Sequence, residues 1–113
     1  MIEIGKYVRT KKGEIMKVTG TPVEQDDIAT YQTDKGWCEL GYNIIKHSKN
    51  IVDLIESGDF VNGERVIETL VTTNRDGSKL HLIRFPTDVI TDNNVKEILT
   101  HEQYKRNCYR LEG

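Results

Sequence analysis

The sequence contains little of what secreted proteins and membrane proteins depend on. Its 113 residues include two cysteines, two prolines, two phenylalanines and one tryptophan. Cys38 and Cys108 are too few for the dense disulfide framework of small secreted domains, so we expect free thiols. No apolar run approaches the roughly 20 residues of a membrane-spanning helix. Glu3 and Gly5 interrupt the segment in which a signal peptide would be apolar, and a cytoplasmic protein is therefore expected.

The motifs of the common enzyme classes are missing as well. The sequence has no P-loop, no Gly-x-Ser-x-Gly motif, no His-Glu-x-x-His motif and no dinucleotide-binding fingerprint. Its serines, Ser48, Ser57 and Ser78, lie in cap or turn contexts with no evident base beside them. These absences predict a non-enzymatic protein without a cofactor.

A zinc site is an alternative to that prediction. The donors would be Cys38, His47, His101 and Cys108, nitrogen and sulfur ligands that zinc accepts in tetrahedral coordination. No Cys-x-x-Cys pair and no closely spaced pair of histidines supports this set. Two buried thiols and two imidazoles near helix caps are the other interpretation.

One pattern is written twice in the chain. Gly5-Lys6-Tyr7-Val8 is followed by a Lys-Lys-Gly turn, and Gly58-Asp59-Phe60-Val61 is followed by Asn62-Gly63. Each copy predicts a glycine bend, a short strand led by an aromatic residue, a tight turn and a second strand, as at the start of many SH3-like barrels. Each copy also ends in a helix-cap signal, Ser48 or Asn50 in the first and the Thr-x-x-Gln box at Thr100 in the second.

The repeat predicts a mainly β, β-rich α+β fold of tandem SH3-like half-barrel units, each ending in a short helix. The predicted domains are residues 1–57 and 58–113. Units of this size lie near the lower limit of independent stability, so we expect them to share a core.

Two further segments carry local predictions. Residues 20–27 contain Pro22 and several acidic residues, which favours a long loop. The strands expected at 65–73 and 79–85 have apolar residues on both faces, which favours a sheet covered on both sides.

Charge is distributed unevenly although the net charge is only −2. Residues 1–19 carry five basic and two acidic residues, residues 20–72 four basic and ten acidic, and residues 73–113 seven basic and six acidic. The acidic middle predicts either a solvated face that keeps the protein in solution or a surface that docks on a basic groove.

The docking interpretation gives the candidate partner-binding residues, which are the acidic side chains of the middle and one aromatic side chain beside a turn. They are Glu24, Asp26, Asp27, Asp34, Trp37, Glu39, Asp53, Glu56 and Asp59. The alternative is a nucleic-acid-binding module that uses the basic first hairpin through Arg9, Lys11 and Lys12.

Four phrases of the sequence resemble a family of small phage and prophage accessory proteins of low-GC Gram-positive bacteria. The phrases are the segment from Ile4 to Thr10 with its Lys-Lys-Gly turn, Lys46–Ile55, Gly58–Gly63 and Ile98–Tyr104, which together span a little under a third of the chain. The resemblance implies a phage context, and small accessory proteins of this kind include inhibitors of host defence, anti-CRISPR proteins among them. It implies no catalytic residue.

Taken together, these observations predict a non-enzymatic phage accessory protein that binds and inhibits a bacterial defence protein, such as a CRISPR effector with a basic nucleic-acid groove. Two alternatives stay open. One is the nucleic-acid-binding module, and the other is a structural or assembly protein of a phage. A homo-oligomer formed through a sheet edge is a further expectation.

Overall fold

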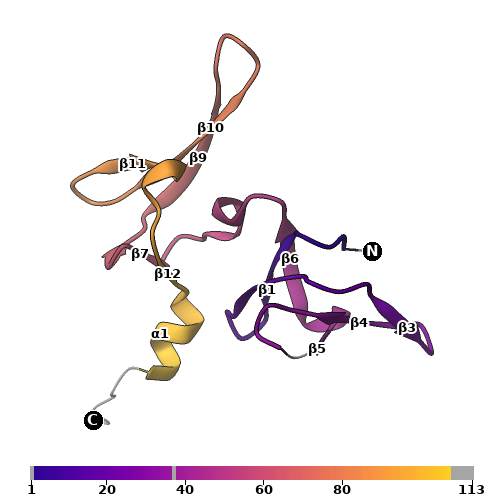
Figure 1. The fold of residues 1–113 in the computed structure, drawn as a ribbon. Helices are drawn as coiled ribbons and strands as arrows, with labels where there is room; N and C mark the ends of the chain where they lie inside the picture. Colours follow the sequence, from indigo (N-terminus) through magenta and orange to yellow (C-terminus); the bar gives the residue numbers. More distant parts are fainter. Residues whose placement is uncertain (1, 37, 108–113) are drawn as a thin grey trace, which may run out of the picture. The chain divides into compact units, whose positions relative to one another are not determined.

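The computed structural model describes residues 2–36 and 38–107 (Figure 1). The chain divides into two compact units, Met1–Leu54 and Ile55–Gly113, and each is described by itself. Short antiparallel strands dominate both units, which confirms the predicted β-rich α+β fold. Trp37, Cys108 and the closing strand expected near residue 110 lie outside the described residues, as do the side chains of Cys38 and Glu39.

The first unit contains two three-stranded antiparallel sheets, with strand orders β2-β1-β6 and β3-β4-β5. Its elements are β1 (Tyr7–Thr10), β2 (Ile15–Lys17), β3 (Val23–Gln25), β4 (Ile28–Gln32), β5 (Cys38–Leu40), the 3-10 helix η1 (Gly41–Asn43), β6 (Ile44–Ser48) and the 3-10 helix η2 (Ile51–Leu54). A single bridge between Val18 and Thr33 joins the continuation of β2 to the continuation of β4.

The core of the first unit is formed by alternate residues of these strands, whose side chains lie on one face of the sheet. Val8 of β1 and Met16 of β2 lie opposite each other and are buried together with Ile2, Val18 and Tyr31. Because opposite residues in an antiparallel pair lie on one face of the sheet, the register places these side chains inward. The Tyr31 hydroxyl accepts a hydrogen bond from the Ile2 N–H at 3.3 Å, so this buried phenol is paired.

The second unit has the sheet orders β12-β7-β8 and β11-β10-β9. Its elements are β7 (Phe60–Val61), β8 (Glu64–Arg65), β9 (Glu68–Thr73), β10 (Lys79–Arg84), β11 (Val89–Thr91), the 3-10 helix η3 (Asp92–Asn94), β12 (Ile98–Leu99) and α1 (His101–Asn107). Its buried apolar side chains are Ile55, Val61, Val66, Ile83 and Phe85.

Both units follow one order of elements: two strands, a three-stranded meander, a 3-10 turn, a closing strand and a closing helical turn. The entry bends match in detail. Gly5 and Gly58 have φ angles of 95° and 93°, and their N–H groups donate to the Val18 and Val66 carbonyls at 2.8 and 2.9 Å. The order that an internal duplication requires is therefore present, while the superposition and a shared core stay predictions.

Several turns are confirmed where the sequence places them. Asn62 and Gly63 both have positive φ angles and connect β7 to β8 in a two-residue hairpin. The helix α1 begins with the expected capping box, in which the Thr100 Oγ1 accepts from the Gln103 N–H and the Gln103 Oε1 accepts from the Thr100 N–H. The first closing helix is instead a short 3-10 turn, capped by Asn50 through the Val52 N–H.

Two predictions about the strands were wrong. Residues 20–27 do not form one long loop, because 23–25 are strand β3 and residues 26 and 27 turn directly into β4. The strand expected at 65–73 is divided into β8 and β9, and β9 is exposed over most of its length instead of being covered on both sides. No helix of the described residues has the length and apolar character needed to cross a bilayer.

Candidate functional site

The hairpin β3–β4 collects the most acidic part of the first unit. Val23 lies opposite Thr30 and Gln25 opposite Ile28, so these four side chains share one face. The other face carries Ala29, which packs against the core, and the first face therefore points outward. Val23 and Ile28 leave 63% and 44% of their surface exposed. An apolar strip thus lies on the outside of this hairpin.

The tip of the same hairpin is a turn made of two aspartates. Asp26 and Asp27 have φ angles of 52° and 65°, a conformation that Asp tolerates better than most non-glycine residues. Both are exposed, as is Glu24 on the preceding strand. A shallow depression of about 370 Å³, lined by Val23, Gln25, Asp26, Ile28 and Thr30, joins the acidic tip to the apolar strip.

The other predicted acidic residues of the first unit lie at turns. Asp34 is exposed, and its Oδ1 accepts a hydrogen bond from the Lys17 N–H at 3.0 Å. Asp53 is exposed at η2, where its Oδ2 accepts from the Ser48 hydroxyl. These two carboxylates stabilise turns and also face solvent. They can add to an acidic surface, although their contacts in the turns are enough to explain their positions.

Asp59 is different, because it is fully buried. Its Oδ2 accepts from the Glu56 N–H at 2.7 Å, and its Oδ1 accepts from the His101 N–H at 2.9 Å. The carboxylate therefore ties the start of α1 to the turn before β7. Burial removes Asp59 from any partner-binding surface, which corrects the prediction made for it.

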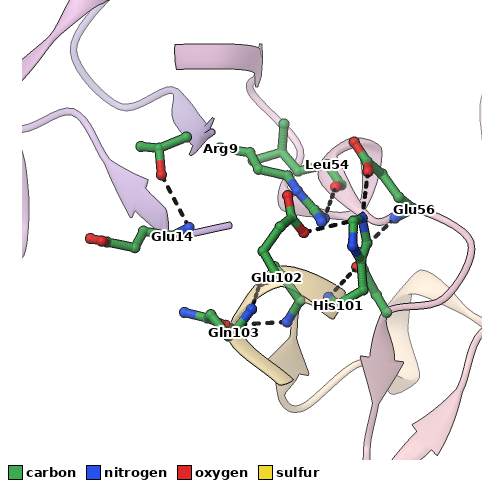
Figure 2. A network of polar contacts seen from close by, with 10 residues as sticks. Arg9, Glu14, Leu54, Glu56, His101, Glu102 and Gln103 are labelled. Carbon is green, nitrogen blue, oxygen red and sulfur yellow. Dashed lines mark hydrogen bonds and ion pairs between the residues drawn. The ribbon is translucent and has the colours of Figure 1, made fainter. Parts of the chain in front are cut away.

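Glu56 also takes part in this polar network, which Figure 2 shows at close range. The His101 Nε2 lies 3.1 Å from a carboxylate oxygen of Glu56 and 3.1 Å from one of Glu102. All three side chains are half-buried, and their potential ligand atoms lie within 4.8 Å of one another. Such a group has a geometry that can hold a cation, and it equally forms a structural network around one imidazole.

The four donors of the alternative zinc set are divided between the two units or lie outside the described residues. His47 is exposed on β6 of the first unit, whereas His101 belongs to the second unit and faces two carboxylates. Cys108 and the Cys38 side chain lie outside the described residues. The neighbours of His101 are thus oxygen donors, which the spacing of cysteines and histidines did not indicate.

The three basic residues of the nucleic-acid alternative differ in exposure. Arg9 is fully buried, and its Nη1 donates to the Leu54 carbonyl at 2.9 Å, as Figure 2 shows. Arg9 is therefore buried and hydrogen-bonded within the chain, and it does not present its guanidinium to a phosphate. Lys11 and Lys12 are exposed in the turn that follows β1, so two of the three predicted basic residues are available.

One feature of the second unit was missed from the sequence. The rings of Phe60 and Tyr104 lie 4.7 Å apart at 36°, and a depression of about 360 Å³ beside them is lined partly by Arg65 and Lys105. The sequence indicates an aromatic residue at the start of β7 and another on the helix. It does not indicate that the helix packs across that strand, because this depends on the turns at Asp59 and Thr100.

No protein-family model, curated protein sequence or solved structure matches this chain.

Proposed function

We propose that this protein is a non-enzymatic binding protein that docks its acidic β3–β4 hairpin on the basic groove of another protein. The observation that carries the proposal is the hairpin itself, in which exposed Val23 and Ile28 share the outward face, the exposed carboxylates of Asp26 and Asp27 form the tip, and exposed Glu24 lies on the other face. Apolar contact supplies affinity in such an interface, and charge supplies orientation and speed of association.

The target class follows from charge complementarity. A groove that binds nucleic acid is lined by lysine and arginine, and its field attracts a surface that presents several carboxylates on a narrow tip. A hairpin is also narrow enough to enter a groove. The resemblance to phage accessory proteins points to a bacterial defence protein, and a CRISPR effector has a positively charged channel of this kind.

The backbone of the turn also supports a role for its charge. Two successive non-glycine residues with positive φ angles are strained, and Asn-Gly would make the same turn at lower cost. The Asn62-Gly63 turn of the second unit uses that less strained solution. A binding role for the two carboxylates explains why aspartates occupy the other tip.

A charge-neutral variant tests the proposal without disturbing the turn. We expect Glu24→Gln, Asp26→Asn and Asp27→Asn together to leave the fold intact, because asparagine also tolerates positive φ angles. Association with a purified, guide-RNA-loaded CRISPR effector should slow by on the order of tenfold, since charges at an interface rim act on the association rate. The matched control is Glu3→Gln, Glu64→Gln and Glu97→Gln, which removes the same charge from other exposed positions.

Direct binding to labelled DNA and RNA across a salt series is the second arm of this test. Wild-type protein should not bind either nucleic acid, whereas a module that works through Lys11 and Lys12 would bind with a steep salt dependence. If the control variant slows association as much as the hairpin variant does, only net charge matters and the hairpin is not the docking surface. Equal rates for the wild type and both variants would reject docking by charge altogether.

A further inference from the structure

Among the described residues, no strand pairs with the outer edge of β9. It is the outer strand of the sheet β11-β10-β9, and at six residues it is the longest edge strand among the described residues. All residues from Thr69 to Thr73 are exposed, and Figure 1 shows β9 and β10 as a long two-stranded arm. The register with β10 runs without a bulge from one end of β9 to the other.

The hydrogen-bonding pattern fixes which backbone groups face outward. At the end of the arm the Asn74 N–H donates to the Ser78 carbonyl at 2.7 Å, so this opposite pair is hydrogen-bonded. Hydrogen-bonded pairs alternate along an antiparallel ladder, and residues 68, 70 and 72 therefore bond to β10. The N–H and C=O groups of Thr69, Val71 and Thr73 consequently point away from the sheet.

This edge lacks the features that normally prevent pairing between sheets. Proteins protect edge strands with charged side chains, proline, bulges or very short strands. The edge strand β6 carries Lys46 and His47, and the three-residue edge strand β3 follows Pro22. From Thr69 to Thr73 the chain is Thr-Leu-Val-Thr-Thr, with no charge and no proline.

We propose that β9 pairs antiparallel with β9 of a second copy of this chain, about a twofold axis at Val71. In this register Val71 lies opposite Val71 of the second copy, and Thr69 lies opposite Thr73. Each of Thr69, Val71 and Thr73 then lies opposite a residue of the second copy whose backbone N–H and C=O groups also point outward. Each such pair exchanges two hydrogen bonds. The two sheets become one continuous sheet.

The side chains fit the same register. Val71 pairs with valine and Thr69 with threonine on one face, while Leu70 lies opposite Thr72 on the other. Pairs of β-branched residues and pairs of threonines are favourable across strands. Glu68 lies opposite Asn74, so no like charges face each other. One sequence satisfies both strands, which is the property that a twofold interface requires and a foreign strand would match only by coincidence.

The proposal is independent of the docking hairpin, because it uses a different strand in a different unit. Sedimentation equilibrium over a concentration series should show a monomer–dimer equilibrium. Val71→Lys places two lysines opposite each other and should abolish the dimer. Val89→Lys is the matched control, since Val89 of β11 is 51% exposed and Val71 is 55% exposed, and it should leave the dimer unchanged.

Paired charges test the register itself. Thr69→Lys with Thr73→Glu places opposite charges across both symmetric pairs and should retain the dimer. Thr69→Lys with Thr73→Lys places like charges there and should yield a monomer. If both double variants behave alike, the register is wrong.

Cross-linking gives a test that does not depend on the strength of the dimer. In a background with Cys38→Ser and Cys108→Ser, Val71→Cys should form a disulfide-linked dimer under mild oxidation, because opposite residues in a hydrogen-bonded pair are about 5.5 Å apart at Cα, within the range of a disulfide. Val89→Cys should form far less. A wild type that stays monomeric up to its solubility limit, together with equal cross-linking of the two cysteine variants, would overturn the proposal.

Discussion

The sheets β3-β4-β5 and β9-β10-β11 occupy the same place in the order of elements of the two units, and they differ in almost every surface property. The first has three-residue outer strands, a proline before one of them and an acidic tip. The second has a six-residue outer strand without charge over its last five residues. The comparison shows that one succession of elements can present either a charged, protected hairpin or an open edge, depending on side chains that do not affect the succession.

The units also differ in how their last helical turn is fixed, and the largest expected effect lies there. Replacement of Asp59 by alanine leaves the N–H groups of Glu56 and His101 without their buried acceptor. We expect a loss of about 3 kcal/mol in the free energy of unfolding of the second unit. In the first unit the matching glycine, Gly5, is followed by Lys6 and not by an aspartate. The amide protons of the first unit should therefore stay protected from exchange in this variant. Urea unfolding followed by NMR separates the two, and an equal loss in both units would contradict the comparison.

The capping box of α1 should contribute less. Thr100→Ala removes the side-chain acceptor of the Gln103 N–H and should cost about 1 kcal/mol, whereas Thr100→Ser should cost much less because it keeps the hydroxyl. Thermal unfolding measures both. Equal destabilisation by the two substitutions would show that the Thr100 methyl group in the interior, and not the cap, is what matters.

The acidic turn should show a smaller effect of opposite sign. Asp27→Gly relieves a φ angle of 65° and is expected to stabilise the first unit by about 0.5 kcal/mol. The same change removes a carboxylate and should slow association with a basic partner. Asp27→Asn is the control, since it removes the charge while keeping the side chain. A destabilised glycine variant would mean that the aspartate side chain supports the turn.

The tip of the β9–β10 arm should respond to pH only locally. Hydrogen bonds from the Ser78 hydroxyl and N–H, at 2.6 and 2.9 Å, hold the pKa of Asp76 below its usual value. Since a lowered pKa in the folded state means that the charged form is favoured there, this small contribution is present at neutral pH and is lost as the pH falls through that pKa. An NMR titration should place the Asp76 midpoint below that of Asp76 in Ser78→Ala. Coincident midpoints would contradict this.

Much of the local structure could be predicted from the sequence, because it depends on near neighbours. Asn62-Gly63 specifies a two-residue turn, and Thr100 with Gln103 specifies a helix start, since each signal is complete within a few residues. The Asp26–Asp27 turn was missed because aspartates without glycine occur in loops as readily as in tight turns.

The candidate site was less accessible to sequence reasoning, because burial depends on contacts between distant segments. Asp59 and Arg9 look like surface charges in the sequence, yet each is buried with a partner far along the chain, His101 and Leu54. Charged residues are almost never fully buried unless they are paired, so exposure is the default expectation for both side chains. The exposed faces of β3 and β9 could not be predicted either, because the alternation of apolar and polar residues does not say which face of a strand another element covers.

Amide hydrogen exchange as a function of protein concentration tests most directly the claim that one sheet edge pairs with a second copy while the other stays free. The outward amides of Thr69, Val71 and Thr73 are the reporters for β9. The Glu24 amide is the reporter for β3. The pair Gln25–Ile28 closes the two-residue turn and is hydrogen-bonded, so the amide of the next residue, Glu24, points away from β4. We expect protection of the three β9 amides to rise with concentration while that of Glu24 stays low. Rapid exchange of all four amides at every concentration would contradict the account.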